Sequence, residues 1–288
     1  MLPILASTRL DVPIRPRSRY SLSVTISVVL ITHNEEANLP RTLDSLLPLV
    51  RDGGGEIVVL DSGSTDSTLE IARGYGAKIF VEPWKGFAAQ KNSAIEKASM
   101  DWMLQLDADE ALELGLAEEI QAALAADSGA VGYWIPRKNF FLRRWMKHGG
   151  FYPDRKLRLI RRGAGRFEEY GAHPTIKIVG PTGNLKHALL HNAYPSLSGY
   201  IEHMNSYSSS GAEIAVAKGH RRFNLLNIVV RPKLTFIYNY ILRLGFLDGR
   251  EGLILHLYHA VYVSWKYAKA WELGKKSGPD ASVRVGKP

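Results

Sequence analysis

Between residues 25 and 106 the chain alternates short apolar runs, rich in β-branched residues, with amphipathic stretches of helical period. This alternation is typical of a parallel β-sheet covered by helices, because parallel neighbouring strands need a long crossover connection. We therefore expect an α/β fold with a mostly parallel sheet flanked by helices. Strands are predicted at 26–31, 56–60, 77–81 and 102–106. Helices are predicted at 37–50, 66–73 and 87–98, the first with an apolar face of Leu39, Leu43, Leu46, Leu47 and Val50.

The composition divides the chain into four parts. Residues 1–24 contain prolines at positions 3, 13 and 16 and an apolar start too short for a secretory signal, so we expect a loosely ordered extension or a misassigned start site. The alternating pattern supports one domain over residues 25–195. Residues 196–274 are expected to form a C-terminal helical region with helices at 197–218, 234–247 and 252–272, followed by a tail at 275–288.

The chain of 288 residues contains no cysteine, which excludes disulfides and cysteine-ligated zinc and fits a cytoplasmic protein. Its formal net charge of +9 favours polyanionic partners. Residues 137–166 mix basic and aromatic side chains, a combination also found in nucleic-acid binders. The alternation at 156–160 nevertheless indicates a strand, and we favour a phosphorylated saccharide over nucleic acid as the partner.

Three polar loops follow predicted strands, at 32–36, 61–66 and 107–110. In open sheets of this kind ligands bind beyond the carboxyl ends of the strands, so these loops are expected to share one site. Asp107 and Asp109 form a carboxylate pair that suits Mg²⁺ or Mn²⁺, whose shell is completed by water and substrate phosphates. Acidic residues also occur at helix starts. We expect Asp66 to cap the helix that follows it, and Glu110 could instead begin the helix predicted at 114–125.

Four motifs match glycosyltransferase family 2 in order and spacing: SVVLITHNEEANL at 27–39, IVVLDSGSTDST at 57–68, QKN at 90–92 and LDADE at 106–110. The chain therefore resembles that family. Within it, the chain is most similar to the bacterial branch that contains the lipopolysaccharide core β-1,4-glucosyltransferases acting on heptose. This likeness includes YPDRKLRL at 152–159 and GFLDG at 245–249, and it covers about residues 25 to 272.

The resemblance implies a GT-A fold, which is Rossmann-like, a UDP-sugar donor, a divalent metal ion and inversion at the anomeric carbon. It assigns Thr32, Asn34 and Glu35 to the loop beside the nucleoside, and Asp61 with Ser62 to recognition of the uracil base. It further implies donor contacts from Lys85, Gln90, Lys91 and Asp107, and a metal held by Asp107 and Asp109. The lysine at position 91 replaces the arginine common in the wider family.

The catalytic base is where the chain departs most from the family. An inverting transferase needs a base on the face opposite the leaving group, to take the proton of the acceptor hydroxyl. Related sequences often carry a His-Glu pair, whereas this chain has His173 followed by Pro174. We take Asp154 as the first candidate base and His173 as the second. A structural pairing of Asp154 with Arg155 or Arg158 is the alternative.

These features predict an inverting, metal-dependent glycosyltransferase that moves a hexose, with glucose favoured, to a saccharide or glycolipid acceptor in lipopolysaccharide core or cell-surface polysaccharide synthesis. A nucleotidyltransferase is disfavoured because loop 32–36 is acidic and lacks glycine. A non-catalytic, membrane-associated scaffold is disfavoured because both Asp107 and Asp109 are present.

The helical region 196–274 is basic and rich in tryptophan and tyrosine, a composition suited to the inner face of an anionic cytoplasmic membrane. A helical subdomain packed on the sheet is the alternative. The segment 252–271 approaches the length of a membrane span, but His256, His259, Lys266 and Lys269 argue against one.

Overall fold

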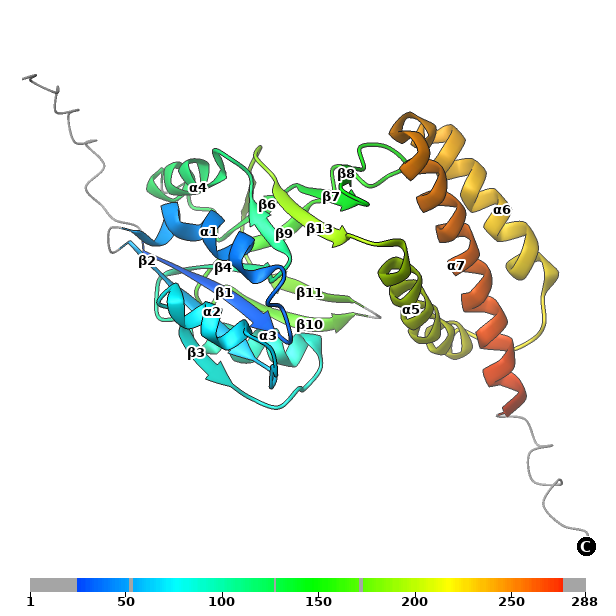
Figure 1. The fold of residues 1–288 in the computed structure, drawn as a ribbon, viewed down its shortest axis with the longest axis horizontal. Helices are drawn as coiled ribbons and strands as arrows, with labels where there is room; N and C mark the ends of the chain where they lie inside the picture. The colour runs from blue at the N-terminus through cyan, green and yellow to red at the C-terminus, as the bar shows by residue number, and fades with distance from the viewer. Residues whose placement is uncertain (1–24, 52–53, 127, 171–172, 277–288) are drawn as a thin grey trace, which may run out of the picture.

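A seven-stranded sheet forms the centre of one half of the molecule, and long helices form the other half (Figure 1). The structure is a computed structural model that describes residues 25–51, 54–126, 128–170 and 173–276. The predicted extension at 1–24 and all but the first two residues of the predicted tail lie outside these ranges.

The central sheet is mostly parallel, as predicted. Its strands follow the order β12-β6-β9-β4-β1-β2-β3. The neighbours β4, β1, β2 and β3 are parallel, whereas β9 runs antiparallel to both β4 and β6. The strand bounds are Ile26–Thr32 (β1), Gly55–Asp61 (β2), Lys78–Val81 (β3), Trp102–Asp107 (β4), Gly132–Ile135 (β6), Lys156–Arg161 (β9) and Thr182–Asn184 (β12).

Side chains from alternate positions of β1 enter two different cores. Val28 and Leu30 pack with helices α1 (Leu39–Val50) and α4 (Leu116–Ala125) on one face, together with part of α2 (Thr68–Gly74). Val29 packs with α3 (Phe87–Glu96) on the other face. Because both faces are covered, the strand reads as one apolar run. The buried residues of α1 include Leu39, Leu43 and Leu46, as predicted, but Leu49 in place of Leu47 and Val50.

Two smaller sheets flank the central one. The first has the order β5-β13-β7-β8, with bounds Glu110–Leu112 (β5), Leu189–Tyr194 (β13), Arg137–Phe141 (β7) and Arg144–Trp145 (β8). The second pairs β10 (Gly165–Tyr170) with β11 (His173–Ile178). Glu110 therefore lies in a strand and does not begin a helix; the helix that follows starts at Leu116.

The C-terminal helices differ from the prediction in their bounds. After α5 (Leu197–Ala217), a helix runs through a π-helical turn (Leu226–Val230), α6 (Arg231–Phe236) and a second π-helical segment (Ile237–Leu242). It thus begins before Pro232, which sits in the first turn of α6. The helix stops before Leu244, whose φ of 59° is left-handed.

A short 3₁₀ turn (Gly245–Asp248) leads into α7 (Gly249–Lys276), which packs lengthwise on α5. Small residues such as Ala212, Ala215 and Ala270 lie in this contact and let the two helices approach closely. In the part of the chain that the structure covers, no helix has both the length and the apolar character of a membrane span.

Candidate active site

A cleft of about 1220 Å³ opens at the carboxyl edge of the central sheet. The register pairs Thr32 with Asp61 and Ile31 with Asp107, so the loops after β1, β2 and β4 meet at this edge. Helices α5 and α7 supply the opposite wall with aromatic side chains, among them Tyr200 and Tyr262. Six of the predicted residues line the cleft: Thr32, Glu35, Ser62, Lys91, Asp107 and Asp109.

Asp61 is fully buried behind the cleft wall. Its Oδ1 accepts hydrogen bonds from the backbone N–H groups of Gly63 (2.8 Å) and Ser64 (2.7 Å). Its Oδ2 accepts from the hydroxyls of Thr32 (2.7 Å) and Ser64 (2.5 Å). Burial alone would raise the pKa of Asp61, but these hydrogen bonds outweigh it and lower the pKa. The carboxylate thus holds the loop that brings Ser62 to the cleft.

The loops after β1 and β2 are tied to each other. Asn34 has a left-handed φ of 56°, and its Oδ1 accepts from the backbone N–H of Thr65 at 2.9 Å, so it does not line the cleft. The N-cap of α2 is Ser67 and not Asp66, although Asp66 Oδ1 accepts from the backbone N–H of Thr68 at 3.0 Å. Burial raises the pKa of Glu35, which reaches the cleft.

The segment before α3 contributes differently from the prediction. Lys85 pairs with Glu82 at 2.6 Å and is not among the residues that line the cleft, whose wall here includes Trp84 and Phe87. Gln90 is buried below that wall; its Nε2 donates to the hydroxyl of Ser62 at 3.2 Å. Its Oε1 has no hydrogen-bond partner among the described residues.

Asp107 is held between two cations. Its Oδ1 lies 2.6 Å from Nζ of Lys91, and its Oδ2 lies 2.6 Å from Nη2 of Arg158. Burial would raise the pKa of Asp107, but Arg158 and Lys91 outweigh it and hold the pKa well below its usual range. Arg158 also donates to the buried Glu110 at 2.9 Å, and Arg137 donates to the same carboxylate at 3.0 Å.

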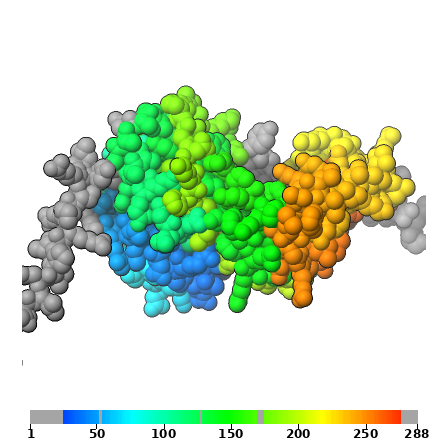
Figure 2. Space-filling model, turned by 90° about the horizontal axis from the view of Figure 1, so that it is seen from above, coloured from blue at the N-terminus to red at the C-terminus, as the bar shows by residue number. Residues whose placement is uncertain are grey.

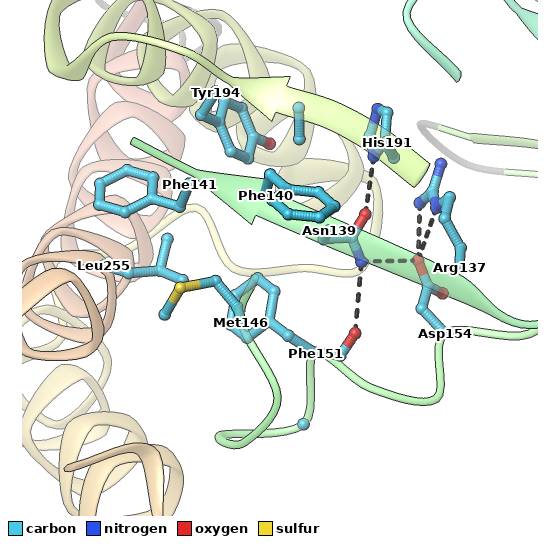
Figure 3. Close-up of a pocket in the computed structure, with 12 residues that line it drawn as sticks. Arg137, Asn139, Phe140, Phe141, Met146, Phe151, Asp154, His191, Tyr194 and Leu255 are labelled. Atoms are coloured by element: carbon cyan, nitrogen blue, oxygen red, sulfur yellow. Dashed lines mark hydrogen bonds and ion pairs between the residues drawn. The ribbon is translucent and has the colours of Figure 1, made fainter. Parts of the chain in front are cut away.

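Asp109 faces a histidine that the sequence alone did not indicate. Its Oδ2 lies 3.1 Å from Nε2 of His191 on β13. The Nδ1 atom of His191 lies 2.7 Å from Oδ1 of Asn139. The amide of Asn139 is oriented by Nδ2, which donates to Asp154 Oδ2 (3.2 Å) and to the carbonyl of Phe151 (3.3 Å), as Figure 3 shows.

This orientation fixes the proton on the inner ring nitrogen of His191. The Asn139 oxygen is an acceptor, so His191 Nδ1 must donate, and Nε2 then faces an acceptor-only carboxylate. Nε2 and the Asp109 carboxylate thus offer two ligand atoms that lie side by side. The carboxylate oxygen suits Mn²⁺ or Mg²⁺, whereas the imidazole nitrogen suits the transition metal Mn²⁺ better than Mg²⁺; phosphate oxygens and water would complete the shell.

The described residues contain no group of three or more His, Asp or Glu side chains placed to hold a metal ion. Asp109 and His191 offer two ligand atoms, so a metal ion held here would need further ligands from substrate or water. Asp107 fits less well as a direct ligand, because both of its oxygens are already engaged by cations.

Asp154 lies beside the cleft, in a smaller cavity of about 270 Å³ that shares Arg137 and His191 with it (Figure 3). It pairs with Arg137 (2.7 Å) and Lys156 (2.9 Å), whereas the structural alternative named Arg155 or Arg158 as its partner. Burial would raise the pKa of Asp154, but the two cations lower it to about 2. The other candidate base, His173, begins β11, and its side chain lies outside the described part of the structure.

Comparison with known proteins gives a consistent result. The model of the family described as Glycosyl transferase family 2 matches residues 27–180. The chain is 32% identical over 254 residues to the lipopolysaccharide core biosynthesis glycosyltransferase LpsC of Rhizobium meliloti, with 86% of this chain and 92% of LpsC covered. It is 29% identical to an uncharacterized glycosyltransferase of Rickettsia typhi, with 88% of each chain covered.

A solved structure supports the fold. The mannosyltransferase PcManGT of Pyrobaculum calidifontis, in complex with GDP-Man and Mn²⁺, superimposes with a TM-score of 0.51 and 16% identity, covering 86% of this chain and 87% of that chain. The predicted family and fold are thereby confirmed: the chain belongs to glycosyltransferase family 2 and has the GT-A fold.

Proposed function

We propose that this glycosyltransferase moves a hexose, with glucose favoured, from a UDP-sugar to a saccharide or glycolipid acceptor of the lipopolysaccharide core, with inversion and with a divalent metal ion. The observation that carries the proposal is the meeting of Ser62, Lys91, Asp109 and His191 in one cleft. The name of the relative LpsC supports the class of acceptor. Such an acceptor belongs to a membrane, so we place the enzyme in the cytoplasm, at the inner face of the cytoplasmic membrane.

The donor is proposed to lie along the carboxyl edge of the sheet. Thr32, Glu35 and Ser62 border the nucleoside, with Asp61 and Asn34 holding the two loops in place. Gln90 Nε2 donates to the Ser62 hydroxyl, and Gln90 Oε1 is a buried acceptor without a partner in the part of the chain that the structure describes. Direct recognition of uracil by Asp61 remains our prediction; it requires the carboxylate to exchange one of its four present hydrogen bonds.

The charges around the cleft support the proposal of a metal ion. The formal charges of the Lys, Arg, Asp and Glu side chains in this cluster cancel before the donor binds: Asp107, Asp109, Glu110 and Asp154 against Lys91, Arg137, Lys156 and Arg158. A diphosphate adds negative charge that this set does not offset. Asp109 and His191 would hold the metal, with Asp107 positioning Lys91 beside the phosphates. When bound, the metal acts as a Lewis acid on the leaving diphosphate.

The acceptor is proposed to bind between the catalytic unit of residues 25–195 and the helical region of residues 196–274. Tyr194, Tyr200 and Tyr262 line that end of the cleft, and flat aromatic rings suit the apolar faces of sugar rings. Asp154 is the proposed base because it lines the smaller cavity that adjoins this end of the cleft through Arg137, His191 and Tyr194; its ion pairs with Arg137 and Lys156 make it a weak base. A weak base accepts the proton late, as the new glycosidic bond forms. His173, next to the cleft residue Pro174, is the second candidate.

Transfer of labelled sugar tests the proposal. The acceptor is glycolipid extracted from cells that lack this chain, and the donors are UDP-glucose, UDP-galactose and UDP-N-acetylglucosamine, each with and without Mn²⁺. We expect incorporation from UDP-glucose that EDTA abolishes and that Asp109→Asn reduces at least 100-fold. Asp101→Asn is the matched control, because Asp101 is exposed and lies just before β4, the strand that leads to Asp109. Incorporation that is equal with and without metal would contradict the proposal.

A further inference from the structure

The helix between residues 225 and 242 carries a stripe of exposed apolar side chains. Leu226, Leu234 and Leu242 are 65%, 60% and 68% exposed, and Val230, Ile237 and Ile241 extend the same stripe at helical spacing. We call the surface of residues 223–247 the apolar face. Soluble monomers rarely expose a continuous apolar patch of this kind without a partner.

The apolar face is basic and has no acidic residue. From residue 219 to 247 the chain contains no Asp or Glu but five cations, Arg221, Arg222, Arg231, Lys233 and Arg243. Lys233 on this helix and Arg222, which directly precedes the apolar face in sequence, are both exposed. Two copies of this surface would repel each other, as would two chains with a net charge of +9. An anionic surface is the partner whose charge is complementary.

We propose that the apolar face docks on the anionic phospholipid headgroups of a membrane leaflet, with its leucines entering the boundary of the acyl chains. An amphipathic helix with basic residues beside an apolar stripe binds in this way and lies in the plane of the interface. This mode agrees with the lack of a spanning helix among the described residues. The proposal rests on the proposed function only for the identity of the membrane that holds the glycolipid acceptor.

The position of the apolar face leaves the cleft accessible. Helix α7 contacts α5 on one side and α6 on the other. The α7 residues His259 and Tyr262 line the cleft, whereas the apolar face occupies the end of the molecule away from the sheet, as Figures 1 and 2 show. Docking therefore fixes the helical region, which forms the acceptor wall, at the surface where a lipid-linked sugar is presented.

Sedimentation with vesicles tests the proposal on the full chain, without donor or acceptor. Vesicles of phosphatidylglycerol and phosphatidylcholine (1:1) are compared with phosphatidylcholine alone. We expect at least tenfold stronger partitioning to the anionic vesicles, weakening severalfold when NaCl rises from 50 to 500 mM. The triple change Leu226→Asp, Leu234→Asp and Leu242→Asp is expected to reduce binding at least tenfold. Arg222→Glu with Lys233→Glu is expected to remove most of the salt dependence.

Matched controls lie in the other half of the molecule. Leu114→Asp with Val179→Asp changes two apolar residues that are even more exposed, and Arg73→Glu reverses an exposed charge on α2. These variants should bind within twofold of the parent chain. The proposal is overturned if the parent binds neutral and anionic vesicles equally or not at all. It is also overturned if sedimentation velocity shows a dimer that the triple change dissociates while vesicle binding is absent. Sugar transfer to a water-soluble acceptor is measured separately, so failure of docking and failure of the proposed function are distinguishable.

Discussion

His191 Nε2 and Asp109 Oδ2 lie 3.1 Å apart, on β13 and in the turn between β4 and β5. The strand pairing that joins them is antiparallel and sets His191 opposite Glu110. Asn139, oriented by Asp154, holds the far nitrogen of the imidazole. A chain of contacts thus links the proposed base, Asp154, to the proposed metal ligands, His191 and Asp109.

Replacing Asp61 tests its role in the donor loop. Asp61→Ala leaves two backbone N–H groups without their acceptor, so we expect a loss of about 2–3 kcal/mol in the free energy of unfolding. Asp61→Asn keeps Oδ1 as an acceptor and should lose about 1 kcal/mol. Urea denaturation gives both values. If both variants lose little free energy of unfolding but no longer bind UDP, Asp61 contacts the uracil directly and the loop does not depend on Asp61 for its stability.

Replacing Asp154 separates catalysis from structure. As the base, Asp154→Asn should lower kcat by about 10²–10⁴-fold and change UDP affinity little. His173→Ala should leave kcat within a few fold. If Asp154→Asn is less stable but keeps its kcat, Asp154 only holds Arg137 and Asn139 in place and is not the base.

The same carboxylate predicts a pH dependence of stability. The pKa of Asp154 is about 2 in the folded protein, below its value of about 3.9 in an unfolded chain. The stabilisation is therefore complete above about pH 4 and is lost as the pH falls toward 2. In Asp154→Asn, the free energy of unfolding should lack this contribution to its decrease between about pH 4 and pH 2. Coincident acid unfolding curves for the two proteins would contradict the assignment.

Replacing Tyr262 tests the acceptor wall. Tyr262→Ala removes a ring from the α7 side of the cleft, and we expect the acceptor KM to rise about tenfold, in line with about 1–1.5 kcal/mol for an aromatic contact. Tyr262→Phe keeps the ring and should restore most of the affinity. UDP affinity, measured in parallel, should not change. An increase in both constants would place the tyrosine near the donor.

The β–α units at residues 25–106 could be predicted because their signal is local. Strands β1, β2 and β4 are buried on both faces, so Val28, Val29 and Leu30 read as one apolar run, and α1 has a clear apolar stripe. The loops after β1, β2 and β4 could be placed together because parallel strands present their carboxyl ends at one edge.

The remaining half of the site depends on pairings between distant segments. His191 lies close to Asp109 only because β13 pairs with β5. Three residues of each strand take part, too few to show a period that would predict the pairing. Arg158 falls in the predicted strand 156–160 and Arg137 in the basic and aromatic stretch 137–166, but nothing in the sequence pairs either of them with Glu110, for which a helix start was one alternative. The only local signal for His191 is a polar His-Asn pair after the apolar Leu189 and Leu190.

The most direct test is calorimetry of UDP binding with and without Mn²⁺ for the parent chain, Asp109→Asn, His191→Ala and the double variant. We predict that Mn²⁺ tightens UDP binding at least tenfold in the parent and in the control Asp101→Asn. Each single variant should lose that gain, and the double variant should bind no more weakly than either single one, because both residues hold the same ion. Retention of the Mn²⁺ effect in both Asp109→Asn and His191→Ala would contradict the account.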